Sequence, residues 1–328
     1  MVGRRSLRPW GRWVTRVGAV DCGTNSIRLL VADAAPGSRS LTDVVRRMEI
    51  VRLGYGVDKT GVIAPEAMAR TLAQAREYAS QCMELGVERV RFVATSASRE
   101  AGNAQEFVAG VRQAFAGFGV APEVITGHEE ASLSFRGATG DLRAAAIPGP
   151  YLMVDIGGGS TEFVRGTDEV EQARSVDVGC VRLTERHLRS DPPTPPQIAA
   201  AVLDVEAAID QAAEVVDFQG ISTLVGLAGS VTTITAHALL LSTYDAERIH
   251  LSRLPVGQVV DACSSLLSMT RAERAALPFM HEGRVDVIGA GALVWRCIVE
   301  RMAGEAGVVE VFTSEHDILD GIALSCLV

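Results

Sequence analysis

The stretch Val154-Asp155-Ile156-Gly157-Gly158-Gly159-Ser160-Thr161-Glu162 decides the fold class of this 328-residue chain. The apolar residues Tyr151 to Asp155 predict a strand that runs into the glycines, and Thr161 to Arg165 predict a returning strand. A turn made of Gly, Ser and Thr exposes several backbone N–H groups to one point, where phosphate oxygens can bind. A tight β-hairpin without a ligand is the alternative, because glycine motifs alone are weakly specific.

The same pattern occurs earlier in the chain. Val20-Asp21-x-Gly23-x-x-Ser26 aligns without a gap with Val154-Asp155-x-Gly157-x-x-Ser160, and each copy lies between two predicted strands. This internal repeat predicts two similar halves that face each other across a cleft. A third glycine turn follows at Gly226-Leu227-Ala228-Gly229-Ser230. Three such turns, two of them led by an aspartate, favour phosphate binding over simple hairpins.

Helical segments alternate with the predicted strands. Pro65 to Leu85 predicts a helix, since proline suits the first helical position and Gly86 suits the end. His128 to Ala138 predicts a second helix, and the break at Ile147-Pro148-Gly149-Pro150 precedes the second glycine turn. Strands that alternate with helices predict an α/β protein.

Composition limits the classes of partner. Hydrophobic residues make up 48% of the chain and charged residues 22%, which is typical of a globular protein, and the length fits two domains. The net charge of −9 argues against nucleic acid or an anionic membrane as a partner. The uncharged stretch Ile221 to Ser242 contains glycine, serine and threonine, so it predicts a buried strand, a Gly-Ser turn and a buried helix instead of a membrane span.

The N-terminus and the cysteines give two further expectations. Four of the first twelve residues are arginines, which predicts a disordered basic tail over residues 1–12 and not a signal peptide. The six cysteines include no CxxC pair, which argues against a zinc knuckle and indicates free thiols in a reducing compartment. We therefore expect a cytoplasmic protein.

Acidic residues lie where they can serve chemistry. A hairpin places Asp155 beside Glu162, and an aspartate at a strand end can hold a magnesium ion or its waters. Glu129 and Glu130 form a second acidic pair at the start of a predicted helix. The alternative for that pair is a solvated helix start, where the helix dipole favours acidic residues. The alternative for Glu162 is a surface position on a strand.

Motifs along nearly the whole chain resemble the exopolyphosphatase/guanosine pentaphosphate phosphatase family. The matching segments are Asp21-Cys22-Gly23-Thr24-Asn25-Ser26-Ile27-Arg28-Leu29-Leu30, Thr95-Ser96-Ala97-Ser98-Arg99 with Asn103, Gly127 to Ala131, Asp155 to Glu162, Ser175 to Leu183, and Gly226 to Thr232. The resemblance implies two ribonuclease-H-like (actin-like ATPase) domains with a phosphate-binding cleft between them. It implies an N-terminal domain at 13–140 plus about 313–328, a second domain at 141–312, and a final helix packed on the first domain.

The resemblance also implies roles for individual residues. The catalytic base would be Glu130, with Glu129 as the alternative and Glu162 as its partner in orienting water. Asp155 and Asp21 would hold Mg²⁺ or Mn²⁺. The residues expected to bind phosphate are Gly23, Thr24, Asn25, Ser26, Arg99, Gly157, Gly158, Gly159, Ser160, Thr161, Gly229 and Ser230.

These features together predict an exopolyphosphatase that releases terminal orthophosphate from inorganic polyphosphate, with short chains preferred, by magnesium-assisted attack of water. Three alternatives stay open: a phosphatase that converts pppGpp to ppGpp, a kinase or ATPase of the actin-like superfamily, and a non-catalytic sensor of ppGpp or polyphosphate. The expected partners are polyphosphate and, as a further candidate, (p)ppGpp of the stringent response. No nucleic acid or membrane is expected, and a homodimer is compatible with the sequence.

Overall fold

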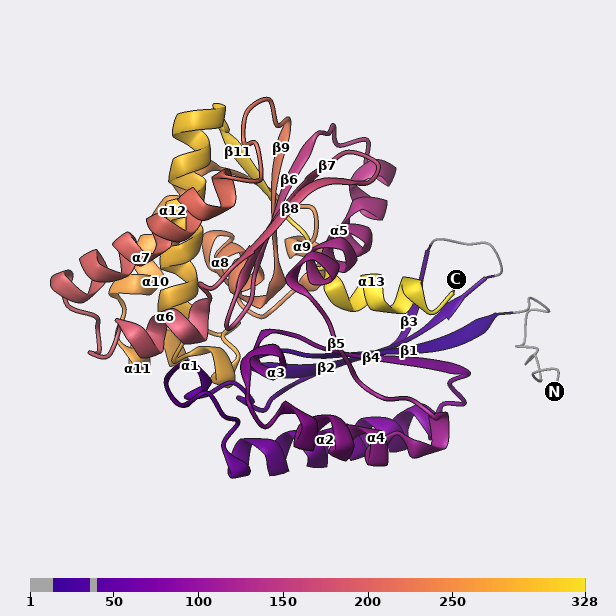
Figure 1. The fold of residues 1–328 in the computed structure, drawn as a ribbon. Coiled ribbons are helices and arrows are strands. Elements are labelled where there is room, and N and C mark those ends of the chain that lie inside the picture. Colours follow the sequence, from indigo (N-terminus) through magenta and orange to yellow (C-terminus); the bar gives the residue numbers. More distant parts are fainter. Residues whose placement is uncertain (1–13, 36–39, 328) are drawn as a thin grey trace. The chain divides into compact units, whose positions relative to one another are not determined.

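The computed structural model describes residues 14–35 and 40–327. The basic tail expected at residues 1–12 lies outside these residues. The chain divides into two compact units (Figure 1), and each is built on one β-sheet. The first unit contains the described residues up to Thr126 and those from Ile318 onward, and the second is Gly127–Asp317.

The first unit is a five-stranded sheet covered by helices on both faces. Its strands are β1 (Thr15–Cys22), β2 (Ser26–Ala34), β3 (Thr42–Ile50), β4 (Arg89–Ala94) and β5 (Glu123–Val124). Their order is β3-β2-β1-β4-β5; the first three form an antiparallel meander, and β4 and β5 continue in parallel with β1. Its helices are α1 (Val57–Thr60), α2 (Pro65–Glu84), α3 (Ser96–Glu100), α4 (Ala104–Ala114), η1 (Ala116–Phe118) and α13 (Ile318–Ser325). In Figure 1, α2 and α4 cover one face of this sheet and α13 covers the other.

The second unit has a six-stranded sheet in the order β10-β11-β9-β6-β7-β8. Its strands are β6 (Tyr151–Ile156), β7 (Thr161–Gly166), β8 (Val170–Val176), β9 (Thr223–Leu227), β10 (Arg253–Pro255) and β11 (Glu310–Thr313). Its helices are α5 (Gly127–Ala144), α6 (Cys180–Arg186), α7 (Pro195–Ala213), α8 (Ala228–Ala238), α9 (Ala246–Ile249), α10 (Val256–Ser268), α11 (Arg271–Ala275), η2 (Glu282–Arg284) and α12 (Ile288–Ala306).

Apart from β10, the second sheet repeats the first. An antiparallel meander (β6, β7, β8) is followed by β9 and β11, which extend the sheet in parallel from β6. The order β8-β7-β6-β9-β11 therefore matches β3-β2-β1-β4-β5, which is the ribonuclease-H-like arrangement. The short repeat in the sequence marks a repeat of the whole sheet, and the predicted α/β fold class is confirmed.

The division between the units falls earlier in the chain than the expected boundary at residue 140. Helix α5 belongs to the second unit because Phe135 and Leu142 pack in one cluster with Tyr151 and Val164 of its sheet. Residues 313–317 also belong to the second unit, since β11 pairs with β9. The boundary follows the burial of apolar side chains, which the Pro-Gly-Pro break does not reveal.

Most of the predicted helices and strands are confirmed, but β3 was missed. The helix predicted from Pro65 is α2, and the uncharged stretch Ile221 to Ser242 forms β9 and α8, as expected. None of the helices in the described part of the chain has the length and apolar character of a membrane span. Strand β3 was not predicted, because Arg46, Arg47 and Glu49 interrupt its apolar pattern. Its place at the sheet edge lets these charges reach solvent or ion-pair partners.

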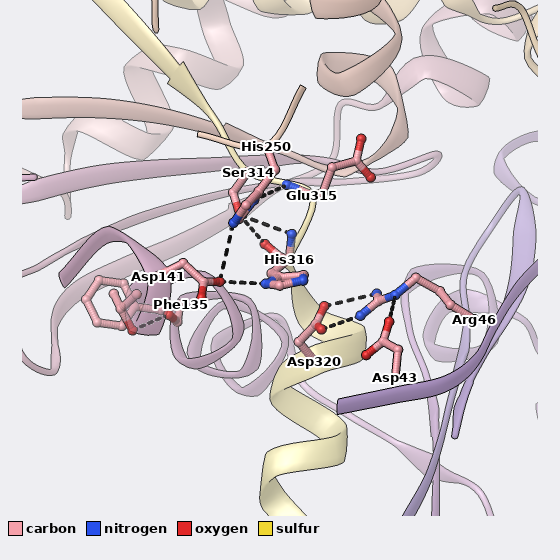
Figure 2. Close-up of polar contacts among 10 residues, drawn as sticks. Asp43, Arg46, Phe135, Asp141, His250, Ser314, Glu315, His316 and Asp320 are labelled. Atoms are coloured by element: carbon pink, nitrogen blue, oxygen red, sulfur yellow. Dashed lines mark hydrogen bonds and ion pairs between the residues drawn. The ribbon is translucent and has the colours of Figure 1, made fainter. Parts of the chain in front are cut away.

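The C-terminal helix returns to the first unit, as the family resemblance implies. The Arg46 guanidinium of β3 contacts both carboxylate oxygens of Asp320 in α13, at 2.5 and 3.2 Å (Figure 2). Asp43 accepts a further hydrogen bond from Arg46. Because Asp320 is buried, this pairing compensates a charge that would otherwise be costly inside the unit.

Candidate functional site

The two aspartate-led turns have the same geometry. The Gly157 N–H donates to the Ser160 carbonyl at 3.0 Å, and the Gly23 N–H donates to the Ser26 carbonyl at 2.9 Å. Each turn joins the first two strands of its sheet, β6–β7 or β1–β2. The sequence alignment thus corresponds to equivalent positions in two equivalent hairpins.

The second turn presents its backbone amides on one side. The carbonyls of Gly157 and Gly158 accept hydrogen bonds from backbone N–H groups at the start of α6, and the Gly159 carbonyl accepts one from Arg182 Nε at 2.7 Å. In a trans peptide, the carbonyl and the next N–H point in opposite directions. The N–H groups of residues 158, 159 and 160 therefore point away from α6. Three amides on one side of the turn offer hydrogen-bond donors to an anion.

The first turn is held in a similar way. The Thr24 carbonyl accepts the Gly54 N–H at 2.9 Å, and the Asn25 carbonyl accepts the Val51 and Arg52 N–H groups at 3.1 and 2.8 Å. The following N–H groups, those of Asn25 and Ser26, consequently point away from residues 51–54. The Thr24 hydroxyl lies 2.8 Å from the Ser96 hydroxyl, which joins this turn to α3.

One position distinguishes the two hairpins electrostatically. Asp155 pairs across the strands with Glu162, whereas the equivalent Asp21 pairs with Arg28. Side chains that lie directly opposite in an antiparallel pair project from the same face, about 5 Å apart at Cβ. Arg28 donates twice to Asp21 Oδ2, at 2.7 and 2.9 Å, so the first hairpin contains an ion pair. The second contains two carboxylates, and Glu162 is only 1% exposed.

Helix α5 brings further groups to the acidic hairpin. Ser134 donates to Asp155 Oδ2 at 2.6 Å, and Ser175 of β8 donates to Glu162 Oε1 at 2.7 Å. Gly127, at the start of α5, packs so closely on Ser175 that an added Cβ would lie 2.5 Å from the Ser175 Cβ. Glu130 lies four residues before Ser134 and therefore on the same helix face.

Glu130, Asp155 and Glu162 all belong to the second unit, and all three are buried. Glu129 is only half-buried on the same first turn of α5. The solvated helix start considered as the alternative does not describe Glu130. Asp155 and Glu162 lie opposite each other, and carboxylate oxygens are ligands that Mg²⁺ accepts.

Two arginines of the predicted motifs donate hydrogen bonds to backbone carbonyls. Arg99, on α3 of the first unit, donates to the Ile125 carbonyl at 2.9 Å. Arg182 is buried and its Nε donates to the Gly159 carbonyl, so this contact stabilises the glycine turn.

The third glycine turn packs against Arg284, a residue that the sequence analysis did not select as a site candidate. Gly229 and Ser230 lie in the first turn of α8, and a methyl group at Gly229 would lie 2.4 Å from Arg284 Nη2. Arg284 also donates to Thr233 Oγ1 at 2.8 Å. The guanidinium therefore packs across the start of α8, where it adds positive charge beside the helix N-terminus. Arg284 is remote from Gly229 in sequence and belongs to no recognisable local pattern.

Cysteines next to the turns are poor nucleophiles. Cys22 and Cys180 are both buried, and burial raises the pKa of each thiol above its usual value. A thiol with a raised pKa stays protonated at neutral pH and reacts slowly. The chemistry available at these turns is consequently that of amides, carboxylates and guanidinium groups.

Comparisons with known proteins find relatives along nearly the whole chain. Residues 30–326 match the model of the Ppx/GppA phosphatase family. The chain is 50% identical over 316 residues to Exopolyphosphatase 2 of Mycobacterium tuberculosis, covering 95% of this chain and 98% of that protein. It is 29% identical to guanosine-5'-triphosphate,3'-diphosphate pyrophosphatase of Aeromonas salmonicida, over 87% of this chain and 54% of that protein. The crystal structure of an exopolyphosphatase-like protein matches with a TM-score of 0.90 and 43% identity, over 95% and 97% of the two chains.

The contact between the second turn and α6 can be tested with Gly179→Ala. The added Cβ would lie 2.6 Å from the backbone of Gly158, which cannot move without displacing the turn. We expect the free energy of unfolding in urea to fall by about 1–3 kcal/mol, the usual range for overpacking. Gly140→Ala is the matched control, because its Cβ meets open space on α5 and should be neutral or mildly stabilising. Equal stability of the two variants would contradict the close contact.

Proposed function

The chain belongs to the Ppx/GppA phosphatase family, and from that premise we propose that it is an exopolyphosphatase that releases terminal orthophosphate from inorganic polyphosphate. The observation that carries the proposal is the 50% identity to Exopolyphosphatase 2, which extends over 98% of that protein. Hydrolysis of a phosphoanhydride requires groups that hold the polyanion, position a water molecule and accept its proton.

Backbone amides supply much of the grip on phosphate in this proposal. The N–H groups of residues 158–160 point away from α6 in the second turn, and those of Asn25 and Ser26 point away from residues 51–54 in the first. Amide donors bind phosphate oxygens without adding net charge, which suits a protein whose overall charge is −9. Arg99 and Arg284 are the side chains proposed to add positive charge.

Magnesium or manganese is the proposed cofactor, and Asp155 with Glu162 is the pair proposed to hold it directly or through water. Two buried carboxylates side by side repel each other, so a divalent cation between them and the substrate would relieve that repulsion. When bound, the ion would neutralise charge on the phosphate oxygens. Asp21 fits this role less well, because Arg28 already neutralises its carboxylate.

Glu130 is the proposed catalytic base. It lies one helical turn before Ser134, which donates to Asp155, and it is buried, whereas Glu129 is more exposed. Glu130 would accept a proton as the oxygen of the water molecule attacks the terminal phosphorus. The bond from that phosphorus to the bridging oxygen breaks, and the shortened chain leaves with the bonding electrons. Glu162 would orient the water.

A second candidate reaction is the conversion of pppGpp to ppGpp. The similarity to the pyrophosphatase of Aeromonas salmonicida favours it, although that identity is 29% against 50%. The reaction also cleaves a terminal phosphoanhydride, so it would use the same residues. The nucleoside end of the substrate distinguishes the two.

The cytoplasm is the proposed location. All six cysteines are buried and unpaired, which is compatible with a reducing compartment.

The proposed reaction is tested by orthophosphate release from polyphosphate and from pppGpp, each with Mg²⁺. We expect a higher kcat/KM on polyphosphate, because the relative with 50% identity is an exopolyphosphatase. A higher kcat/KM on pppGpp would establish the second candidate instead. Release from neither substrate, together with tight binding in calorimetry, would show a sensor.

Glu130→Gln tests the assignment of the base. The amide keeps the size of the side chain but cannot accept the proton, so kcat should fall by about a hundredfold to ten-thousandfold. Circular dichroism should show an unchanged fold. Glu129→Gln is the matched control on the adjacent residue and should retain most activity. A larger loss in Glu129→Gln than in Glu130→Gln would exchange the two roles.

A further inference from the structure

Two histidines and an aspartate converge in the second unit, away from the glycine turns in sequence. His316 Nδ1 lies 2.5 Å and His250 Nε2 lies 3.6 Å from Asp141 Oδ2 (Figure 2). The two imidazole rings lie 4.7 Å apart between centroids. All three ligand atoms fall within 4.8 Å of one another. Among the described residues, no other group of three His, Cys, Asp or Glu side chains has this spacing.

The backbone holds these side chains in place. His250 precedes Leu251, whose N–H donates to the Thr313 carbonyl at 2.7 Å, and the Thr313 N–H donates back to the Ser252 carbonyl at 3.1 Å. The segments that carry the two histidines are therefore paired like neighbouring strands. The buried Ser314 hydroxyl fixes the next turn, since it accepts the His316 N–H and donates to the His316 carbonyl. The histidine positions are consequently preorganised by the backbone.

We propose that Asp141, His250 and His316 form a binding site for a divalent transition-metal ion of the zinc class. Two imidazole nitrogens and one carboxylate oxygen are ligands that zinc accepts and that magnesium disfavours. The three side chains are half-buried, so an ion can enter from solvent and retain a water as its fourth ligand. The site is separate from the proposed magnesium site and does not rest on the proposed function.

Zinc binding would replace two hydrogen bonds that the histidine rings form in the structure. His316 Nδ1 contacts Asp141, and His250 Nδ1 accepts the Glu315 N–H at 3.2 Å. Zinc at His316 Nδ1 and His250 Nε2 requires each neutral ring to carry its proton on the other nitrogen. The long Glu315 N–H contact to His250 would then be lost. The short hydrogen bond between His316 Nδ1 and Asp141 would be lost as well, so two hydrogen bonds are exchanged for two metal–imidazole bonds and one metal–carboxylate bond.

The ion would join two segments that are far apart in the chain. Asp141 lies near the end of α5, the helix with which the chain enters the second unit at Gly127. His316 lies directly before Asp317, where the chain leaves that unit. A bound ion would thus fasten the exit segment to α5. Because α5 also carries Glu130 and Ser134, the ion would add rigidity to the helix of the proposed base.

Zinc titration of the full chain, stripped of metal with a chelator, tests this site. In calorimetry we expect the wild type to bind one zinc ion per chain. In His250→Gln and His316→Gln we expect the dissociation constant to be larger by at least about a hundredfold. Cobalt(II) added to the wild type should give visible absorption bands of a nitrogen-ligated ion. Zinc should also raise the melting temperature of the wild type but not of the two variants.

His187→Gln is the matched control. His187 Nε2 lies 3.0 Å from Asp204 Oδ2 in the same unit, but Arg186 shares that carboxylate in place of a second histidine. This variant should bind zinc like the wild type. Equal zinc affinity in the wild type and in both His250→Gln and His316→Gln would place the ion elsewhere and overturn the proposal. Absence of zinc and cobalt binding by the wild type would overturn it without reference to how any variant folds.

Discussion

Electrostatic repulsion between the Asp155 and Glu162 carboxylates is the main constraint on the packing around the second glycine turn. The hairpin register fixes the two carboxylates on one face of β6 and β7, and both are buried. Such a placement is costly unless donors or cations compensate it. Ser134 of α5 and Ser175 of β8 each donate to one of the acids, so the packing of two further elements depends on this pair.

The first unit shows the same hairpin without that repulsion. Arg28 stands where the second hairpin has Glu162, and it forms an ion pair with Asp21. The backbone geometry of the two turns is equivalent, so a single position determines whether the hairpin carries an ion pair or two carboxylates. A duplicated glycine turn can in this way acquire two different side-chain environments. The amide-rich turn is the shared part, and the acidic pair is the part proposed for metal binding and hydrolysis.

Much of the fold could be predicted because its signals are local. The glycine turns, the flanking strands and helix α2 are each specified by adjacent residues, and the alignment around Asp21 and Asp155 indicated the duplication. Strand β3 escaped prediction because its charged residues are accommodated only at a sheet edge, and Arg46 finds its partner Asp320 near the other end of the chain. The place of α5 in the second unit depends likewise on tertiary packing.

The candidate site likewise combines residues that local motifs indicate with features that depend on tertiary packing. Glu129, Glu130 and Glu162 were found from motifs, but the burial of Glu130 and the role of Ser134 required the packing of α5 on the sheet. Arg284 at Gly229 and the cluster of Asp141, His250 and His316 join distant segments, so no spacing in the sequence reveals them.

The most direct test is the Mg²⁺ concentration that gives half-maximal phosphate release in Asp155→Asn and Asp21→Asn, the equivalent changes in the two hairpins. If the acidic pair holds the ion, Asp155→Asn should raise that concentration by about tenfold or more, whereas Asp21→Asn should leave it within about twofold. A larger rise in Asp21→Asn, or an equal rise in both variants, would contradict the assignment of the metal to the hairpin of Asp155 and Glu162.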